Sequence, residues 1–207
     1  MTEDDFIWRD GYWWPASDDH LHKIIKRSLD DIDVCLKHVK GRKVAVQAGG
    51  NVGVWPNYLS KAFTLVHTVE PDIANYTCLQ RNANGNVFHY YAAYGAKWST
   101  AKVNRIEGNC GAGWMEEDGR VTVMPIDTYD LKTCDLIMLD VEGGEYAALL
   151  GARKTLERCK PVVHFEEKGL GVEHYGQEPG AVEAFLTSLG YKVVEKVRND
   201  VIMVHGG

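Results

Sequence analysis

Short stretches of consecutive apolar residues alternate along this chain with segments whose apolar residues recur every three or four positions. Unbroken apolar stretches are typical of strands buried on both faces, and the longer spacing is typical of helices with one buried face. The stretches fall at residues 43–47, 64–70, 86–92, 135–140 and 161–166, and helices are predicted up to Phe63 and over 72–82, 145–158 and 182–189. The alternation predicts an α/β fold whose parallel sheet has helices on both faces.

The end of the chain departs from this alternation. Residues 191–197 and 201–205 are two further strand-like runs, and only Arg198, Asn199 and Asp200 separate them. A connection this short allows only antiparallel pairing, because a parallel crossover needs a dozen or more residues. We therefore predict a seven-stranded, mostly parallel sheet with an antiparallel last strand.

The segment between the third and fourth predicted strands contains no amphipathic helix. Strands are predicted at 102–107 and 121–124, and Asp118-Gly119 is a hairpin-turn signal. Gly111–Trp114 is predicted to be a mobile loop beside the site, and Gly169–Gly180 a glycine-rich loop that places His174 over it. We expect a β-hairpin insertion between strands three and four.

Before the first strand, one helix is predicted from an N-cap at Ser17 to Gly41. Three aromatic residues precede this helix, namely Trp8, Trp13 and Trp14. They are candidates for an apolar lid over a site, and the alternative is simple packing onto the domain.

Length and composition fit one domain over residues 1–207, divided into an N-terminal arm and helix (1–42) and an α/β core (43–207). The net charge is −6 and the basic residues are dispersed, so nucleic acid is not an expected partner. The five cysteines include no CxxC pair, which disfavours zinc. The acidic N-terminus is unlike a signal peptide and no apolar run approaches a membrane span, so a cytoplasmic protein without membrane contact is expected.

The first strand leads into a glycine-rich bend, Gly49-Gly50-Asn51-Val52-Gly53, and then into a helix. Such a bend at the carboxyl end of a strand lets a ligand approach the backbone and the free amides of a helix N-terminus. The second strand ends at Glu70, where an acid can accept hydrogen bonds from ribose hydroxyls. Both nicotinamide dinucleotides and S-adenosylmethionine carry that ribose.

The glycine spacing separates these two cofactors. A dinucleotide fingerprint would need glycine at Ala48, whereas the methyltransferase pattern, acid-x-Gly-x-Asn/Gly-x-Gly, matches from Gln47 to Gly53 with Gln47 in place of the acid. Gln47 can still accept a hydrogen bond but attracts a positively charged methionine group less strongly. The spacing and the terminal hairpin favour S-adenosylmethionine and disfavour a nicotinamide oxidoreductase.

Several motifs between residues 44 and 167 occur together in one family. They are Val46–Gly53, Val69-Glu70-Pro71, Ile126-Asp127, Asp140-Val141-Glu142-Gly143 and Pro161–Glu166. In this combination the chain resembles the FkbM-family methyltransferases. The resemblance implies a Rossmann-like class I methyltransferase fold and transfer of a methyl group from S-adenosylmethionine to a hydroxyl oxygen on a small molecule, sugar or glycan.

The resemblance also implies a set of cofactor-binding residues. These are Gln47, Gly49, Asn51, Gly53 and Glu70, with adenine near Ala93 and Tyr94 and a further contact at Asp140.

Acidic residues end the fourth and fifth strands, where an acceptor hydroxyl would need help in losing its proton. Asp140, Glu142 and Glu166 are the candidates, and His174 is an alternative base. Catechol-type O-methyltransferases hold magnesium with acids at these strand ends, so Asp140 and Glu166 are also candidate Mg²⁺ ligands. The alternative role for Asp140 and Glu142 is capping of the following helix.

One other function stays open at this point. Gln47 and the lack of a separate substrate domain also suit a non-catalytic module that binds S-adenosylmethionine for regulation or scaffolding.

Overall fold

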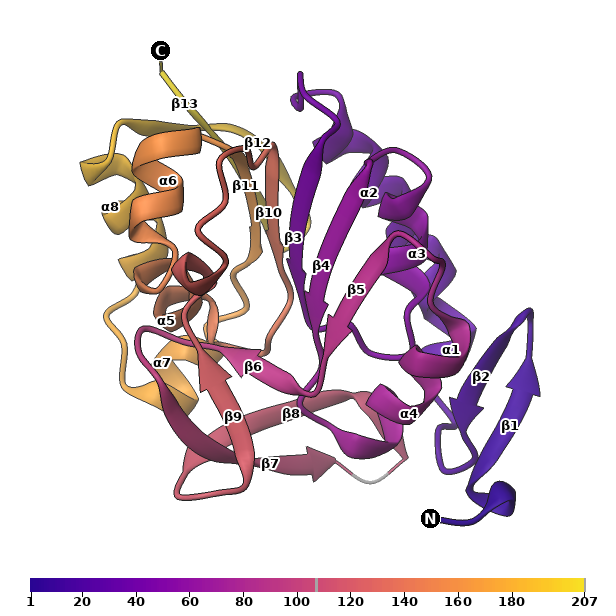
Figure 1. Ribbon diagram of the computed structural model, residues 1–207. Helices are drawn as coiled ribbons and strands as arrows, with labels where there is room; N and C mark the ends of the chain where they lie inside the picture. Colours follow the sequence, from indigo (N-terminus) through magenta and orange to yellow (C-terminus); the bar gives the residue numbers. More distant parts are fainter. Residues whose placement is uncertain (107, 207) are drawn as a thin grey trace.

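The computed structural model of the chain describes residues 1–106 and 108–206. Its main sheet has seven strands in the order β12-β13-β11-β10-β3-β4-β5 (Figure 1). They are β3 (Val44–Ala48), β4 (Leu65–Val69), β5 (Val87–Tyr90), β10 (Leu136–Leu139), β11 (Val162–Glu166), β12 (Tyr191–Val197) and β13 (Asp200–His205). Strands β3, β4, β5, β10 and β11 are parallel, and β13 is antiparallel to its neighbours β11 and β12. The prediction of an α/β fold with a large, mostly parallel sheet is confirmed.

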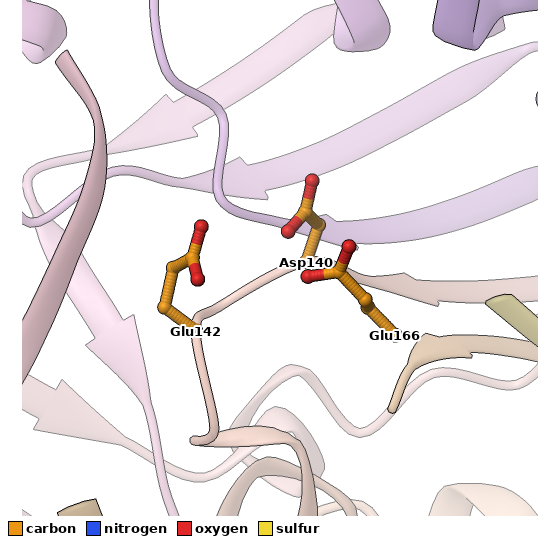
Figure 2. Close-up of side chains that lie close together, drawn as sticks. All are labelled: Asp140, Glu142 and Glu166. Carbon is orange, nitrogen blue, oxygen red and sulfur yellow. The ribbon is translucent and has the colours of Figure 1, made fainter. Parts of the chain in front are cut away.

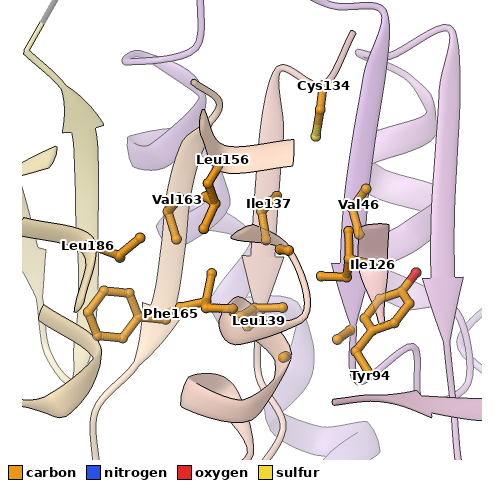
Figure 3. Close-up of a cluster of buried hydrophobic side chains, with 14 of the residues drawn as sticks. Val46, Tyr94, Ile126, Cys134, Ile137, Leu139, Leu156, Val163, Phe165 and Leu186 are labelled. Carbon is orange, nitrogen blue, oxygen red and sulfur yellow. The ribbon is translucent and has the colours of Figure 1, made fainter. Parts of the chain in front are cut away.

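Helices cover both faces of this sheet (Figure 1). One layer contains α2 (Leu29–Leu36), α3 (Val54–Ser60) and α4 (Ile73–Asn82), and the other contains α5 (Glu145–Leu150), α6 (Arg153–Cys159) and α8 (Ala181–Ser188). Side chains alternate between the two faces of a strand, so Ile137 and Leu139 pack toward Leu156 of α6 (Figure 3), whereas Leu136 and Met138 belong to the opposite core. Burial on both faces explains the unbroken apolar stretches.

A second sheet lies beyond the carboxyl ends of the parallel strands (Figure 1). It has the order β6-β9-β7-β8 and consists of β6 (Ala92–Tyr94), β7 (Ser99–Ile106), β8 (Asn109–Glu117) and β9 (Val121–Met124). The predicted third strand is therefore two strands, because the chain leaves the main sheet after Tyr90 and enters the small one at Ala92. This sheet roofs the edge where ligands bind in open α/β folds.

The predicted hairpin insertion contains a third strand. The two predicted strands correspond to β7 and β9, which pair antiparallel, whereas β8 lies between them in the sequence and pairs with β7. Asp118-Gly119 forms the turn between β8 and β9, which are not neighbours in the sheet. Gly111–Trp114, predicted as a mobile loop, lies within β8 and pairs with β7. Glu107, the predicted last residue of the strand that corresponds to β7, lies outside the described residues.

The N-terminal segment begins with η1 (Glu3–Asp5) and a hairpin of β1 (Phe6–Arg9) and β2 (Tyr12–Pro15). The single helix predicted from Ser17 is divided into α1 (Leu21–Ile24), η2 (Ile25–Ser28) and α2. Its first turn is capped by Asp18 rather than Ser17, since the Asp18 carboxylate accepts from the backbone N–H groups of Leu21 and His22, both at 3.0 Å.

Two further segments differ from the prediction. The helix predicted over 145–158 is interrupted at Gly151, where a Cβ atom would lie 2.1 Å from the carbonyl oxygen of Gly95. The predicted glycine-rich loop contains a short helix, α7 (Leu170–Tyr175), and η3 (Ile126–Tyr129) precedes β10. No helix in the described part of the chain has the length and apolar character needed to cross a bilayer.

Candidate functional site

A cavity of about 1190 Å³ lies at the carboxyl ends of β3, β4, β10 and β11, where the strand order reverses between β3 and β10. Its walls come from the loops after these strands, from the small sheet and from α1 and η2. A crevice at this reversal point is the usual ligand site of an open α/β sheet.

The bend after β3 forms part of the wall. Gly49, Gly50 and Asn51 line the cavity, whereas Gly53 is the N-cap of α3 and does not. Gly49 has φ 80°, and a Cβ atom there would lie 2.0 Å from the carbonyl oxygen of Asp140. Glycine is thus required by the close approach of two protein loops, and not only by the approach of a ligand as the sequence suggested.

Gln47 lies beneath this bend and does not line the cavity. Its side chain is fully buried, and its amide donates to the carbonyl oxygens of Ala48 (2.8 Å) and Gly49 (3.0 Å). Its own carbonyl oxygen accepts from the hydroxyl of Thr68. Gln47, predicted to bind the cofactor, therefore lies inside strand β3 and does not open onto the cavity.

Glu70 follows β4 and points toward the bend. Its Oε2 accepts from the backbone N–H of Asn51 at 2.7 Å and its Oε1 from that of Asp72 at 2.8 Å. Burial raises the pKa of Glu70 to about 7, although the same backbone hydrogen bonds act in the opposite direction. The glycine-rich bend and the Glu70 carboxyl group therefore lie side by side, as expected from the sequence.

Asn75, in the first turn of α4, is a cavity residue that the sequence analysis missed. Its Nδ2 donates to the carbonyl oxygen of Cys110 on β8 at 2.7 Å, and Asn51 Nδ2 donates to the same oxygen at 2.8 Å. Asn75 is only 4% exposed, and its Oδ1 has no hydrogen-bond partner among the described residues. A buried acceptor without a donor beside Glu70 fits a ligand hydroxyl.

Ala93 and Tyr94, the predicted adenine neighbours, lie on β6 and line the cavity. Tyr94 is mostly buried, and its hydroxyl oxygen lies 3.0 Å from that of Tyr129. Burial raises the pKa of Tyr94, so its hydroxyl stays neutral. Both residues therefore offer mainly apolar surface and backbone to a ligand.

The carboxylates of Asp140, Glu142 and Glu166, called the carboxylate cluster below, point toward one another (Figure 2). One oxygen from each lies within 4.8 Å of those of the other two. Glu142 has φ 52°, which non-glycine residues adopt rarely, so the backbone is strained where it enters the cavity. Gly144 is the N-cap of α5, so neither Asp140 nor Glu142 occupies the cap position itself.

Electrostatics at the cluster follow from burial and crowding. Burial raises the pKa of Asp140 well above its usual range, and the charges of Glu166 and Glu142 raise it further. Burial also raises the pKa of Glu142, while Lys168 lowers it. Lys168, which the sequence analysis did not select, lines the same cavity and places its Nζ 2.6 Å from Glu166 Oε1.

His174 also lines the cavity, from α7. Its ring stacks on Trp114 of β8, with ring centroids 4.7 Å apart and planes 4° apart. The hydroxyl of Tyr175 accepts from the backbone N–H of Met115 at 2.9 Å, which fixes α7 against β8.

The three N-terminal tryptophans, in contrast, do not line the cavity. Their hairpin packs on α4, where Trp13 and the side chain of Asn82 exchange two hydrogen bonds of 2.9 Å. The tryptophans thus pack onto the domain, which was the alternative to a lid over the site.

A sequence model of the family described as "Methyltransferase FkbM domain" matches residues 47–193 of this chain. A search among curated proteins gives no match. Among solved structures, the methyltransferase FkbM from Methylobacillus flagellatus KT superposes with a TM-score of 0.54 at 18% identity, covering 81% of this chain. This chain spans 44% of the length of that protein.

Two other structures are similar over most of both chains. Ribosomal protein L11 methylase from Lactobacillus delbrueckii subsp. bulgaricus gives a TM-score of 0.52 at 13% identity, with 100% of this chain and 84% of that chain covered. SMU.1697c, a putative methyltransferase from Streptococcus mutans solved in complex with SAH, gives 0.50 at 15% identity, with 86% and 97% covered. At these identities the likeness concerns the fold.

Proposed function

Because the chain belongs to the FkbM methyltransferase domain family, we propose that it transfers a methyl group from S-adenosylmethionine to a hydroxyl oxygen of a small molecule, sugar or glycan. One observation carries this proposal: a single cavity contains both the bend with Glu70 and the carboxylate cluster. A cofactor held at the bend would face an acceptor held at the cluster. The SAH complex of the Streptococcus mutans protein supports the choice of cofactor.

The cofactor side of the cavity is assigned to residues from three loops. The backbone of Gly49–Asn51 would meet the methionine part, Glu70 and Asn75 the ribose, and Ala93 with Tyr94 the adenine. The unpartnered Oδ1 of Asn75 supports this fit, since a ribose hydroxyl would donate to it. Gln47 and Gly53 would act indirectly by shaping the bend. When bound, S-adenosylmethionine supplies an electrophilic methyl group on a positively charged sulfur.

The acceptor side is assigned to the carboxylate cluster. Glu142 is the proposed general base, because it lines the cavity and its raised pKa brings its basicity closer to neutral pH. As the new carbon–oxygen bond forms, the acceptor hydroxyl would give its proton to Glu142. Asp140, whose pKa is raised by burial and by its acidic neighbours, is proposed to hydrogen-bond to the acceptor beside the cofactor. His174 is the second candidate for the base.

Magnesium, for which Asp140 and Glu166 were the predicted ligands, fits this cluster poorly. Glu166 Oε1 already accepts from the Lys168 ammonium at 2.6 Å, so the cluster carries its own cation. We therefore assign no step to a metal ion. The non-catalytic alternative is not favoured either, since its main ground was the neutral Gln47, and that side chain holds the bend together instead of facing the cavity.

The proposal is tested by titrating purified protein with S-adenosylmethionine in a calorimeter and by assaying transfer of a labelled methyl group to a panel of hydroxylated acceptors. We expect micromolar binding and transfer to at least one acceptor. Glu70→Ala should abolish binding, whereas Glu157→Ala, which alters an exposed ion pair with Arg153, should leave it unchanged. Binding of a nicotinamide dinucleotide in place of S-adenosylmethionine would refute the cofactor assignment.

A further inference from the structure

The carboxylate cluster already contains a cation that belongs to the chain. Lys168 Nζ lies 2.6 Å from Glu166 Oε1, and Lys168 also interacts electrostatically with Asp140 and Glu142. Its side chain is 40% exposed and lines the same cavity as the three acids. The ammonium of Lys168 therefore interacts electrostatically with all three carboxyl groups of the cluster.

The backbone explains why Lys168 reaches this position. Glu166 is the last residue of β11, but the N–H of Glu167 still donates to the carbonyl oxygen of Asn199 at 2.8 Å. The chain thus continues in an extended form for one more residue, and in extended chain every second side chain lies on the same face. Residues 166 and 168 are consequently directed to the same side, toward the cavity.

A divalent cation would compete with this ammonium. The three acidic oxygens lie within 4.8 Å of one another, which is compatible with ligands around one ion, since metal–oxygen distances are about 2.0–2.6 Å. A bound divalent ion would, however, lie a few ångströms from a fixed positive charge and would share Glu166 with it. Like charges a few ångströms apart repel each other, and more strongly than in bulk water because the three acids are half-buried.

We propose that Lys168 takes the place of a divalent cation in the carboxylate cluster, so that the cluster works without metal and becomes a metal site only when the ammonium is removed. The role of Lys168 in catalysis, as distinct from its effect on metal binding, rests on the proposed function. Lys168 is a positioning residue: it neutralises and orients Glu166, leaving Glu142 to receive the proton. Methyl transfer from a sulfonium needs no Lewis acid, because the leaving group departs as a neutral thioether.

The experiment measures Mn²⁺ binding by the loss of the free-ion signal in electron paramagnetic resonance. Wild type, Lys168→Arg and the matched control Lys196→Ala, which removes an exposed ammonium paired with Glu183, should show only weak, non-saturating binding. Lys168→Met should bind one Mn²⁺ per chain at least tenfold more tightly than wild type, with a dissociation constant on the order of 10⁻⁴ M or below. Asp140→Asn in the Lys168→Met background should remove this binding.

Two results would overturn the proposal. One is stoichiometric Mn²⁺ binding by the wild type that Asp140→Asn abolishes, which is informative even if the Lys168 variants do not fold. The other is a folded Lys168→Met protein, verified by circular dichroism, that binds Mn²⁺ no better than wild type. Neither readout depends on methyl transfer, and S-adenosylmethionine binding is measured separately, so failure of this inference can be told apart from failure of the proposed function.

Discussion

At one end of the cavity both oxygens of Glu70 accept hydrogen bonds from backbone N–H groups, those of Asn51 and Asp72, at 2.7 and 2.8 Å. At the other end, the hydrogen bonds found within residues 1–106 and 108–206 include none to the carboxylates of Asp140 and Glu142, whose nearest acidic partners are each other and Glu166. At the first end, the hydrogen bonds of the carboxylate are already made within the protein. At the second end, Asp140 and Glu142 can still accept hydrogen bonds from a ligand.

The difference follows from how each end is built. Glu70 accepts from the backbone N–H of Asp72, two residues further along the chain, and from that of Asn51, which the bend after β3 brings beside it, so backbone donors reach both of its oxygens. The carboxylate cluster depends on two strand ends, β10 and β11, that meet only in the folded sheet. Buried acids without donors and the positive φ of Glu142 reduce stability, a cost that is common at reacting centres.

The largest effect is expected at the acceptor end, from Glu142→Gln. Removing a general base typically lowers turnover by about 10²–10⁴-fold, and S-adenosylmethionine affinity should not change because Glu142 is not assigned to the cofactor. The assay is methyl transfer to the acceptor found in the panel, with calorimetry for binding. The control is Glu167→Gln, an exposed neighbouring acid. Unchanged turnover would remove Glu142 from the mechanism, and His174→Ala would then test the second base.

The next prediction concerns stability as a function of pH and uses Glu145, behind the cluster. Burial raises its pKa from 4.5 to about 7, although backbone hydrogen bonds, including one from Val141 N–H at 3.0 Å, act in the opposite direction. Between these two pH values the folded chain binds this proton and the unfolded chain does not. Stability is therefore highest below pH 4.5 for this group and falls as the pH rises toward 7, by at most about 3 kcal/mol.

Glu145→Gln isolates this contribution, because glutamine keeps an oxygen for the Val141 N–H but cannot ionise. The free energy of unfolding is measured in urea at pH 5 and pH 8. Relative to wild type, the variant should gain stability at the higher pH. The difference between proteins is the useful quantity, since burial lowers the pKa of His67 and His89 and these groups change stability in the opposite direction. An equal difference at both pH values would contradict the raised pKa.

Much of the main sheet was predictable because its strands are buried on both faces and leave unbroken apolar stretches. Strand β8 was not, since its first half, Asn109–Gly113, has small and polar residues without alternation, and its extended form depends on pairing with β7 and on hydrogen bonds from Asn51 and Asn75 to Cys110. The split of the first helix was hidden for a related reason, because the helical spacing continues through η2.

At the site, sequence reasoning expected Glu70 and the three acids to lie together because each lies at or shortly after the carboxyl end of a parallel strand, and these ends share one edge. It assigned Gln47 to the cofactor, whereas the structure buries this side chain beneath the bend, as a position inside a five-residue buried strand requires. Lys168 and Asn75 carry no local signal of function. The role of Lys168 depends on how far β11 stays extended, and that of Asn75 on a carbonyl oxygen of β8.

Asn75 provides the smallest and most selective test of the binding end. Its Oδ1 is buried without a hydrogen-bond donor, so a hydroxyl of the bound cofactor should donate to it. Asn75→Leu removes this acceptor and keeps a side chain of similar volume. One neutral hydrogen bond contributes about 1 kcal/mol, so the S-adenosylmethionine dissociation constant should rise roughly fivefold. Cys110 keeps a partner in Asn51, which limits the damage to the fold.

A matched asparagine away from the cavity separates binding from stability. Asn86→Leu breaks two hydrogen bonds to the carbonyl oxygens of Ser60 and Phe63 outside the cavity, so it should lower the melting temperature and leave the dissociation constant unchanged. Asn75→Leu should do the reverse, weakening binding with a smaller loss of melting temperature. If Asn75→Leu bound the cofactor as tightly as wild type, the unpartnered oxygen would not face the ribose. The difference between the two ends of the cavity would then disappear, because the Glu70 end would also contain a buried polar atom, Asn75 Oδ1, that stays without a hydrogen-bond partner when the cofactor is bound.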